Sequence, residues 1–331
     1  MYMTTAKKYA ALEKMSDKNG VIAALAIDQR GSLKKMLAAA ANKPANEEDI
    51  VEFKKAIASE LTPYASAILL DPEYGLPASK VRAAGSGLLV SYEKTGYDAT
   101  EPGRLPDLIS VWSVRRLKEA GADSIKFLLY IDPDEDKSII DQKEAFVERI
   151  GDECVAEDIP FFVELVTYDD SIGDVKSAEY AKVKPHKVIE AMKEFSKPKY
   201  NIDVLKVEVP INLDYVEGFN GDNPVVYTKD EAIKYFKEQS DATNLPYIFL
   251  SAGVSAKAFR DELHLAKDAD AKFNGVLCGR ATWRGAIEPF AKDGEEAGKK
   301  WMNDQGKKNI EELNEVLAET ATSWKEKVSK D

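Results

Sequence analysis

The 331-residue sequence contains only two cysteines and two histidines, and it has no long apolar segment. Cys154 and Cys278 lie far apart in the chain, so they form no disulfide framework, and their scarcity fits a reducing compartment. No apolar run approaches the ~20 residues that a membrane span needs, and the N-terminal residues lack the apolar core of a signal peptide. We therefore expect a cytoplasmic protein without a membrane partner.

An excess of positive charge is also missing. The chain has 46 Lys and Arg against 58 Asp and Glu, a formal net charge of -12. Nucleic-acid-binding proteins normally present a basic face, so the charge argues against a nucleic-acid partner. It does not argue against anionic substrates, because a few local Arg and Lys side chains can dominate the potential inside a cleft.

The scarcity of histidine bears on metal binding. His186 and His264 do not form a pair at metal-ligand spacing, so the sequence predicts no zinc site. A magnesium site built from the oxygens of Asp28, Asp71 or Glu73 stays open as an alternative. Our preferred interpretation uses neither a metal nor another cofactor.

What the sequence does contain is a regular series of short apolar runs rich in Val, Ile, Leu and Phe. Amphipathic helical stretches separate them, as a parallel sheet covered on both faces requires. Two helix signals stand out: a capping box of Thr228 and Glu231, and a predicted helix over 106–121 with Pro106 near its start and Gly121 past its end. The eight predicted strands are 21–28, 65–72, 87–94, 124–131, 161–168, 203–210, 246–253 and 273–280.

Eight strands, each followed by a helix, predict the α/β class and a single (β/α)8 TIM barrel over residues 1–331. A C-terminal surface helix is expected at about 305–322, with a tail that frays into solvent. The alternative is an open doubly wound sheet, but no GxGxxG turn follows the first strand.

A lysine interrupts the strand DVLKVEVP at 203–210. Alternate residues of a strand share a face. The all-apolar set Leu205, Val207 and Val209 should meet the outer helices, and this turns Lys206 into the barrel. A lysine is rarely buried unless it is paired, so this position needs an explanation.

The same alternation turns Lys126 inward in strand 124–131 and Glu164 inward in strand 161–168. The three strands are neighbours in a barrel, so Lys126, Glu164 and Lys206 should form one cluster. Asp28, with Gln29 and Arg30, adds polar groups at the same mouth. A self-contained structural ion network is the alternative, but this fold places its chemistry at the carboxyl ends of the strands.

Two lysines and a carboxylate are the groups that Schiff-base chemistry needs. Burial and a second cation such as Lys126 favour a neutral, nucleophilic Lys206, which can attack a carbonyl carbon. Glu164 would then move protons during carbinolamine and imine formation.

A phosphate site is predicted at the ends of the last two strands. LSAGVSAK (250–257) and LCGRATWRG (277–285) bring small residues and backbone N–H groups to a position where this fold often binds phosphate. The predicted contacts are made by Ser251, Gly253, Gly279 and Arg280. Arg30, or another basic residue such as Arg82, is the candidate for a second phosphate.

Long stretches of the chain resemble the class I tagatose 1,6-bisphosphate aldolases of Gram-positive bacteria. The resemblance runs from about residue 8 to the end, and its longest stretches include ALAIDQRGSLKKM, ELTPYASAILLDPEYGLPASKVRA, GADSIKFLLYIDPDED, IPFFVELVTYD, DVLKVEVPINLDYVEGF and LSAGVSAKAFRDEL. It implies a (β/α)8 lyase that cleaves D-tagatose 1,6-bisphosphate to dihydroxyacetone phosphate and D-glyceraldehyde 3-phosphate. It also implies tolerance of other ketohexose 1,6-bisphosphates and a place in lactose and galactose breakdown.

The resemblance implies residue roles as well. Lys206 matches the Schiff-base lysine, Glu164 the acid/base glutamate and Lys126 the supporting lysine. Asp28 and Gln29 match residues near the substrate hydroxyls. Ser251, Gly253, Gly279 and Arg280 match the phosphate cradle.

Three other functions stay open at this point. They are a Schiff-base aldolase for a sulfonated ketose phosphate, a sugar-phosphate-binding regulatory protein on an aldolase scaffold, and a metal-dependent isomerase or class II aldolase. The expected partners are a small phosphorylated sugar and a second copy of the chain in a homodimer.

Overall fold

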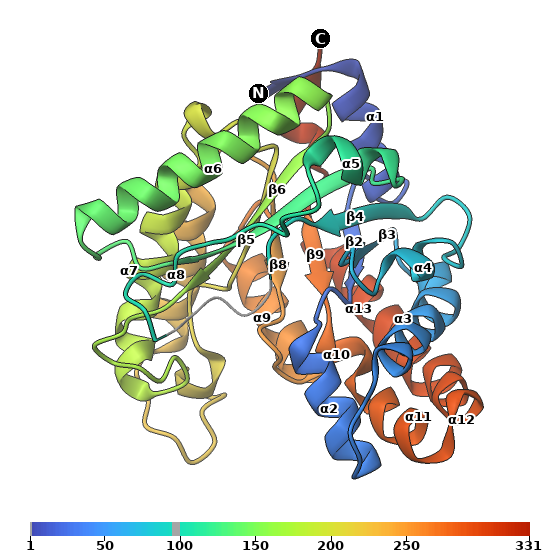
Figure 1. Ribbon diagram of the computed structural model, residues 1–331. Helices are drawn as coiled ribbons and strands as arrows, with labels where there is room; N and C mark the ends of the chain where they lie inside the picture. The colour runs from blue at the N-terminus through green and yellow to red at the C-terminus, as the bar shows by residue number, and fades with distance from the viewer. Residues whose placement is uncertain (1, 95–99) are drawn as a thin grey trace.

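The computed structural model of the protein describes residues 2–94 and 100–331. Eight parallel strands close a barrel in chain order, and helices surround it (Figure 1). All eight predicted strands and the predicted barrel are confirmed. The barrel strands are β2 (Ile22–Ala26), β3 (Ala67–Leu70), β4 (Gly87–Ser91), β5 (Ser124–Ile131), β6 (Phe161–Thr167), β7 (Val204–Val207), β8 (Tyr247–Leu250) and β9 (Gly275–Cys278).

The helices alternate with the strands, and several extra ones follow β9. The α-helices are α1 (Ala6–Met15), α2 (Gly31–Ala41), α3 (Glu47–Leu61), α4 (Leu76–Ser79), α5 (Val114–Glu119), α6 (Lys137–Glu157), α7 (Ala178–Phe195), α8 (Lys229–Asp241), α9 (Ala256–Asp268), α10 (Arg280–Trp283), α11 (Ile287–Asp293), α12 (Glu295–Trp301) and α13 (Lys307–Thr320). Short 3-10 turns lie at Thr62–Tyr64, Pro198–Tyr200, Leu213–Tyr215, Arg284–Ala286 and Trp324–Glu326, with a π turn at Met302–Gly306. Among the described residues, no helix is both long and apolar enough to cross a lipid bilayer.

Helix signals in the sequence had mixed success. The capping box is confirmed, because the Thr228 side chain accepts from the backbone N–H of Glu231 and the Glu231 side chain accepts from the N–H of Thr228. The predicted helix over 106–121 is wrong for its first half. Ser113 caps a short helix α5, while Leu108 forms an isolated antiparallel bridge with Glu93. The apolar residues at helical spacing therefore belong to two different structures.

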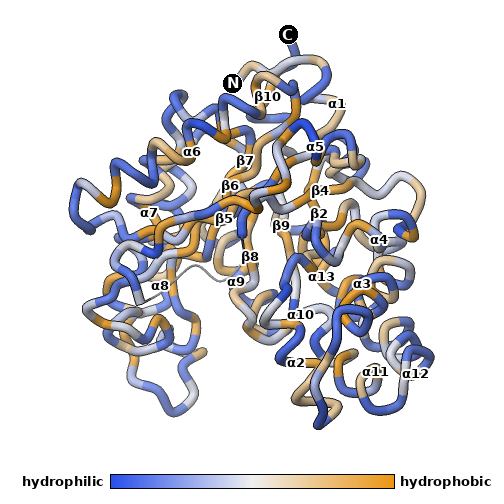
Figure 2. Tube along the Cα trace, in the orientation of Figure 1, coloured by the Kyte–Doolittle hydropathy of each residue, from blue (hydrophilic) through white to orange (hydrophobic). Residues whose placement is uncertain are grey.

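The strand faces have the predicted orientation. The outward residues of β5, β6 and β7, such as Phe127, Val163 and Leu205, pack in one large cluster with the helices. A second cluster fills the barrel interior, and it includes Phe162 and Val204. Figure 2 shows the central strands as largely hydrophobic, and the helices around them as mixtures of hydrophobic and hydrophilic segments.

The two ends of the chain close the barrel at the amino ends of its strands. Leu12 and Met15 of α1, together with Trp324 and Val328, pack on the interior cluster. A short strand β1 (Tyr2–Thr4) pairs in parallel with β10 (Val328–Lys330), and the two chain ends lie side by side in Figure 1. The C-terminal helix expected at about 305–322 corresponds to α13, but the expected frayed tail is wrong. The reason is apolar burial, since Trp324 is fully buried.

Candidate active site

A cavity of about 350 Å³ opens at the carboxyl ends of the barrel strands. Strands β2, β5, β6, β7, β8 and β9 contribute to its wall, as expected for the end of a TIM barrel that carries chemistry. All ten of the predicted site residues line it. These are Asp28, Gln29, Arg30, Lys126, Glu164, Lys206, Ser251, Gly253, Gly279 and Arg280.

Lys206 and Glu164 lie opposite one another on neighbouring strands. Their Cα atoms are paired in the register of β6 with β7, so both side chains enter the barrel at one height. Lys206 Nζ lies 2.7 Å from Glu164 Oε1, and the two residues are only 4% and 7% exposed. A charge-assisted contact of this length fixes both groups where solvent is scarce.

Lys126 lies at the centre of a cluster of carboxylates. Its Nζ lies 2.7 Å from Glu164 Oε2, 2.9 Å from Asp28 Oδ2 and 2.7 Å from Glu93 Oε1. Glu164 therefore bridges the two lysines, with one oxygen on each. Among residues 2–94 and 100–331, Lys126 contacts three carboxylates and Lys206 contacts one, so the two lysines occupy different electrostatic environments.

The pKa values follow this arrangement. Burial alone would lower the pKa of Lys126, but Asp28, Glu164 and Glu93 outweigh it and raise that pKa well above the usual range. Burial alone would raise the pKa of Asp28 and of Glu164, but Lys126 and Lys206 outweigh it and lower both. Lys126 is therefore a permanent cation at neutral pH. Burial, only partly offset by Lys126, raises the pKa of Glu93.

The loop after β8 and the start of α10 form a cradle of small residues. Ala252 and Gly253 both have positive φ values, 47° and 80°. A Cβ at position 253 would lie 3.0 Å from Nη2 of Arg280, and one at position 279 would lie 3.1 Å from the carbonyl oxygen of Ala26. Side chains at these two positions would push Arg280 and the backbone apart, so glycine keeps the guanidinium against the loop. This cradle has the shape and charge for an oxyanion.

A family model described as DeoC/LacD family aldolase matches residues 22–285 of this chain, which include the whole barrel. The chain belongs to this family.

Relatives of this aldolase are similar along nearly their whole length. Tagatose 1,6-diphosphate aldolase 2 of Enterococcus faecalis is 60% identical over 328 residues, 99% of this chain and 98% of that protein. Tagatose 1,6-diphosphate aldolase of Streptococcus pneumoniae is 58% identical over 324 residues, 98% of this chain and 99% of the relative. The resemblance noted in the sequence is therefore confirmed at the level of the family.

A solved structure supports the fold of the aldolase. Fructose-bisphosphate aldolase from Plasmodium falciparum superimposes with a TM-score of 0.65 at 15% sequence identity. The match covers 95% of this chain and 91% of that chain. At this identity the likeness concerns the barrel architecture alone.

Arg30 of the aldolase lines the cavity but is already engaged. Its guanidinium pairs with Glu73, and its Nη2 donates to the carbonyl oxygen of Glu93 at 2.7 Å. The alternative guess for a second phosphate, Arg82, is wrong: Arg82 donates to the backbone carbonyls of Ser79 and Ser86 and is not part of the cavity wall. The backbone contacts hold it beside α4 instead.

The carboxylates considered for magnesium each contact a cation. Asp28 pairs with Lys126, Asp71 with the fully buried Lys54, and Glu73 with Arg30. Within residues 2–94 and 100–331, no three or more His, Cys, Asp or Glu side chains are grouped so that they could hold a metal ion. His186 contacts Asp134 at the surface, with 2.9 Å between Nε2 and Oδ1.

Sequence reasoning missed Glu93, which is 4% exposed and accepts hydrogen bonds from Lys126 Nζ and from the backbone N–H of Leu128. The signal was available, because Glu93 follows Leu89 and Ser91 on the inner face of the fourth strand. Glu93 is the third carboxylate that holds Lys126 in place.

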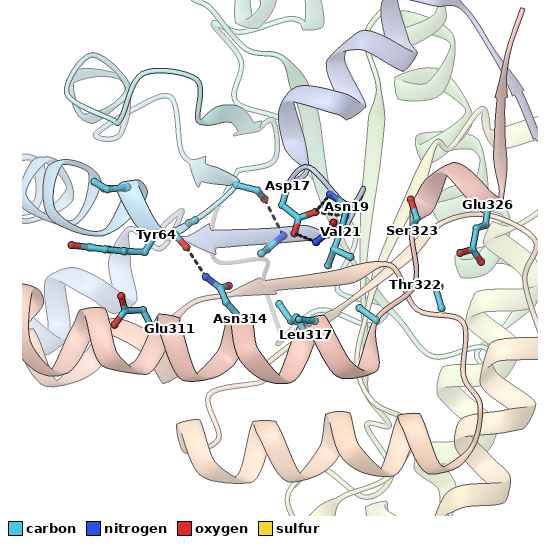
Figure 3. Close-up of a pocket in the computed structure, with 16 residues that line it drawn as sticks. Asp17, Asn19, Val21, Tyr64, Glu311, Asn314, Leu317, Thr322, Ser323 and Glu326 are labelled. Atoms are coloured by element: carbon cyan, nitrogen blue, oxygen red, sulfur yellow. Dashed lines mark hydrogen bonds between the residues drawn. The ribbon is translucent and has the colours of Figure 1, made fainter.

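A larger cavity of about 720 Å³ lies at the amino ends of β2 and β3, beside α13 (Figure 3). Several of its polar groups are engaged within the protein. The Asp17 carboxylate accepts from the N–H groups of Asn19 and Val21, and the Asn314 amide donates to the carbonyl oxygen of Tyr64. None of the ten predicted site residues lines it.

Proposed function

We propose that the protein is a class I, metal-independent aldolase that cleaves D-tagatose 1,6-bisphosphate through a Schiff base on Lys206. The observation that carries this proposal is the chain of contacts Lys206–Glu164–Lys126 inside the cavity. The proposed substrate comes from the names of the two relatives, which are both called tagatose 1,6-diphosphate aldolases.

In the proposed first stage, the amine of Lys206 attacks the C2 ketone of the open-chain sugar. Glu164 takes the proton that Lys206 gives up before the attack and delivers it to the carbinolamine hydroxyl, which leaves as water, and an iminium ion remains on C2. Lys126 supports this step because its Nζ, 2.7 Å from Glu164 Oε2, holds the carboxylate beside Lys206.

In the second stage, a base removes the proton of the C4 hydroxyl, and the C3–C4 bond breaks. We assign this role to Glu164 or to a phosphate of the substrate. The electron pair of the broken bond flows into the iminium to give an enamine, and D-glyceraldehyde 3-phosphate leaves. Protonation at C3 and hydrolysis of the resulting imine release dihydroxyacetone phosphate and restore Lys206.

Borohydride trapping tests the Schiff base directly. Protein incubated with dihydroxyacetone phosphate and borohydride should carry one reduced three-carbon phosphate adduct, on the peptide that contains Lys206. Peptide mass spectrometry locates it. An adduct on Lys126 would exchange the roles of the two lysines. Protein that cleaves the bisphosphate but forms no adduct would contradict the imine mechanism.

We infer a position for the second phosphate of the substrate by elimination among the cations that line the cavity. Lys126 is held by three carboxylates, Lys206 is the proposed nucleophile, Arg280 belongs to the cradle and Arg30 is engaged. The remaining cation is Lys94, whose one ion-pair partner among residues 2–94 and 100–331 is Asp107, at 3.2 Å, and both side chains are well exposed. An exposed pair of this kind is weak and exchanges readily for a phosphate.

Replacing Lys94 with glutamine should therefore raise KM for the bisphosphate by about 10-fold or more, because a charged contact to phosphate is lost. Cleavage of a ketohexose 1-phosphate, which lacks the second phosphate, should be unchanged. Steady-state kinetics on the two substrates check this.

Lys137→Gln is the matched control, since Lys137 is also exposed and paired with an aspartate but lies on α6 outside the cavity. If Lys94→Gln lowers kcat/KM equally for both substrates, Lys94 does not bind the second phosphate.

We also propose, from the resemblance, that the aldolase accepts other ketohexose 1,6-bisphosphates and serves lactose and galactose breakdown in the cytoplasm as a homodimer. Cleavage assays with the diastereomers and size-exclusion chromatography with light scattering test the first and last points.

A further inference from the structure

Glu208 differs from the other carboxylates that line the catalytic cavity. Asp28, Glu93 and Glu164 all pair with Lys126. Glu208 lines the same cavity but has no ion-pair partner among residues 2–94 and 100–331. An unneutralised carboxylate is unexpected in a site that binds a bisphosphate, because like charges repel.

Glu208 is nevertheless held firmly. It lies two residues beyond Lys206, directly after the end of β7 and one step closer to the mouth. Its Oε2 accepts from the backbone N–H of Thr167 at 2.8 Å and from the Thr167 hydroxyl at 2.7 Å. Its backbone carbonyl accepts from the Gln239 amide at 2.8 Å. Glu208 is thus held at one carboxylate oxygen and at its backbone carbonyl, and a side chain held in this way is pre-organised for a contact.

The direction of the hydrogen bonds shows which kind of group Glu208 can bind. The Tyr180 hydroxyl donates to Thr167 Oγ1 at 2.7 Å, and the Thr167 hydroxyl in turn donates its hydrogen bond to Glu208 Oε2. Glu208 Oε2 is thus an acceptor in both contacts, which suits the ionised carboxylate. Its other oxygen, Oε1, accepts no hydrogen bond from the described part of the chain. The free position calls for a donor.

We propose that Glu208 is a specificity-determining residue whose Oε1 accepts a hydrogen bond from a hydroxyl group of the bound open-chain sugar phosphate. The inference rests on the proposed function, since the substrate supplies the donor. The phosphate groups of the substrate repel this carboxylate. The hydroxyl groups of the substrate can donate hydrogen bonds to it. Because Glu208 is fixed, it meets a hydroxyl in one configuration better than in the other.

The substitution Glu208→Gln replaces the acceptor Oε1 with a donor NH2 group and leaves the contacts with Thr167 intact. The glutamine oxygen can still accept both bonds from Thr167, and its NH2 group then faces the cavity as a donor. The thermal midpoint should stay close to that of the wild type. The lysine that forms the adduct is untouched, so borohydride trapping at saturating dihydroxyacetone phosphate should persist.

The decisive measurement is kcat/KM for two C4 epimers, D-tagatose and D-fructose 1,6-bisphosphate. For Glu208→Gln we expect a fall of about 10–100-fold for the better-matched epimer, the range for losing a hydrogen bond to a charged group. The ratio between the epimers should change at least fivefold. Unchanged values, or equal losses for both epimers, would overturn the inference, because a purely structural role lowers both alike.

Controls separate this inference from the proposed function. Glu238→Gln makes the same charge change on the exposed side of α8 and should leave the ratio unchanged. Thr167→Val removes one of the two bonds that hold Glu208 and should shift the ratio in the same direction, while Thr167→Ser should restore it. If the wild-type protein cleaves both epimers without forming an adduct, the proposed Schiff base is wrong, but the inference about Glu208 is unaffected.

Discussion

Lys206→Met is expected to abolish cleavage, with kcat/KM lower by about 10⁴-fold or more, because the side chain that we propose forms the covalent bond is gone. Methionine fills a similar volume and cannot attack a carbonyl. Glu164 keeps its contact with Lys126, 2.7 Å from Oε2, so the protein should still fold. Steady-state assays combined with borohydride trapping measure the loss.

Lys206→Arg is the informative companion. It retains the positive charge beside Glu164 but is not nucleophilic, since a guanidinium stays protonated. If the charge of Lys206 were what matters, the arginine variant would keep substantial activity. The imine mechanism requires both variants to be equally inactive and to form no adduct.

Lys126→Met is expected to cause the largest loss of stability as well as a loss of activity. The substitution leaves Asp28, Glu93 and Glu164 without their shared cation inside the barrel. Breaking a buried pair costs about 3–5 kcal/mol in free energy of unfolding, because the remaining charge is uncompensated. Urea denaturation at neutral pH, followed by circular dichroism, measures this difference.

The loss should depend on pH with a definite sign. In the wild type, the lowered pKa values of Asp28 and Glu164 give stability that is present above their ordinary pKa and lost as pH falls through the lowered values. Without Lys126, burial dominates and raises these pKa values. The folded variant then binds protons more readily than the unfolded chain, so its deficit should shrink from pH 8 to pH 5.

Lys54→Met offers a comparison, because Lys54 is also fully buried but pairs with one carboxylate, Asp71. Its deficit should change less with pH than that of Lys126→Met. A deficit for Lys126→Met that is constant from pH 8 to pH 5 would contradict the pairing of Lys126 with ionised Asp28 and Glu164.

The positions of the proposed catalytic side chains were predictable because strand geometry has a period of two. Once the apolar residues of β7 are assigned to the helices, Lys206 has to face inward, and the same count applies to Lys126 and Glu164. The contact of Lys126 with Glu164 then follows from the order of strands in a barrel. Local sequence pattern and global fold agree here.

Other features depend on contacts between distant parts of the chain. The pairing of Lys54 on α3 with Asp71 after β3 requires the packed barrel, and no spacing in the sequence announces it. The helix predicted over 106–121 failed because Leu108 is bridged to Glu93 from the preceding strand, so a tertiary contact overrides helical periodicity. The prediction of a frayed tail failed for the same reason, because the indole N–H of Trp324 donates to the hydroxyl of Ser16, 308 residues earlier.

The pairing of β1 with β10 has a consequence for biosynthesis. Tyr2–Thr4 are synthesised long before their partners Val328–Lys330, and Trp324 beneath the barrel is made only slightly earlier than those partners. All eight barrel strands are made before Trp324, so the apolar interior at their amino ends stays exposed to solvent until Trp324 and Val328 have been added. A nascent chain that stalls before Trp324 would therefore expose the apolar surface of Leu12 and Met15 to chaperones and proteases.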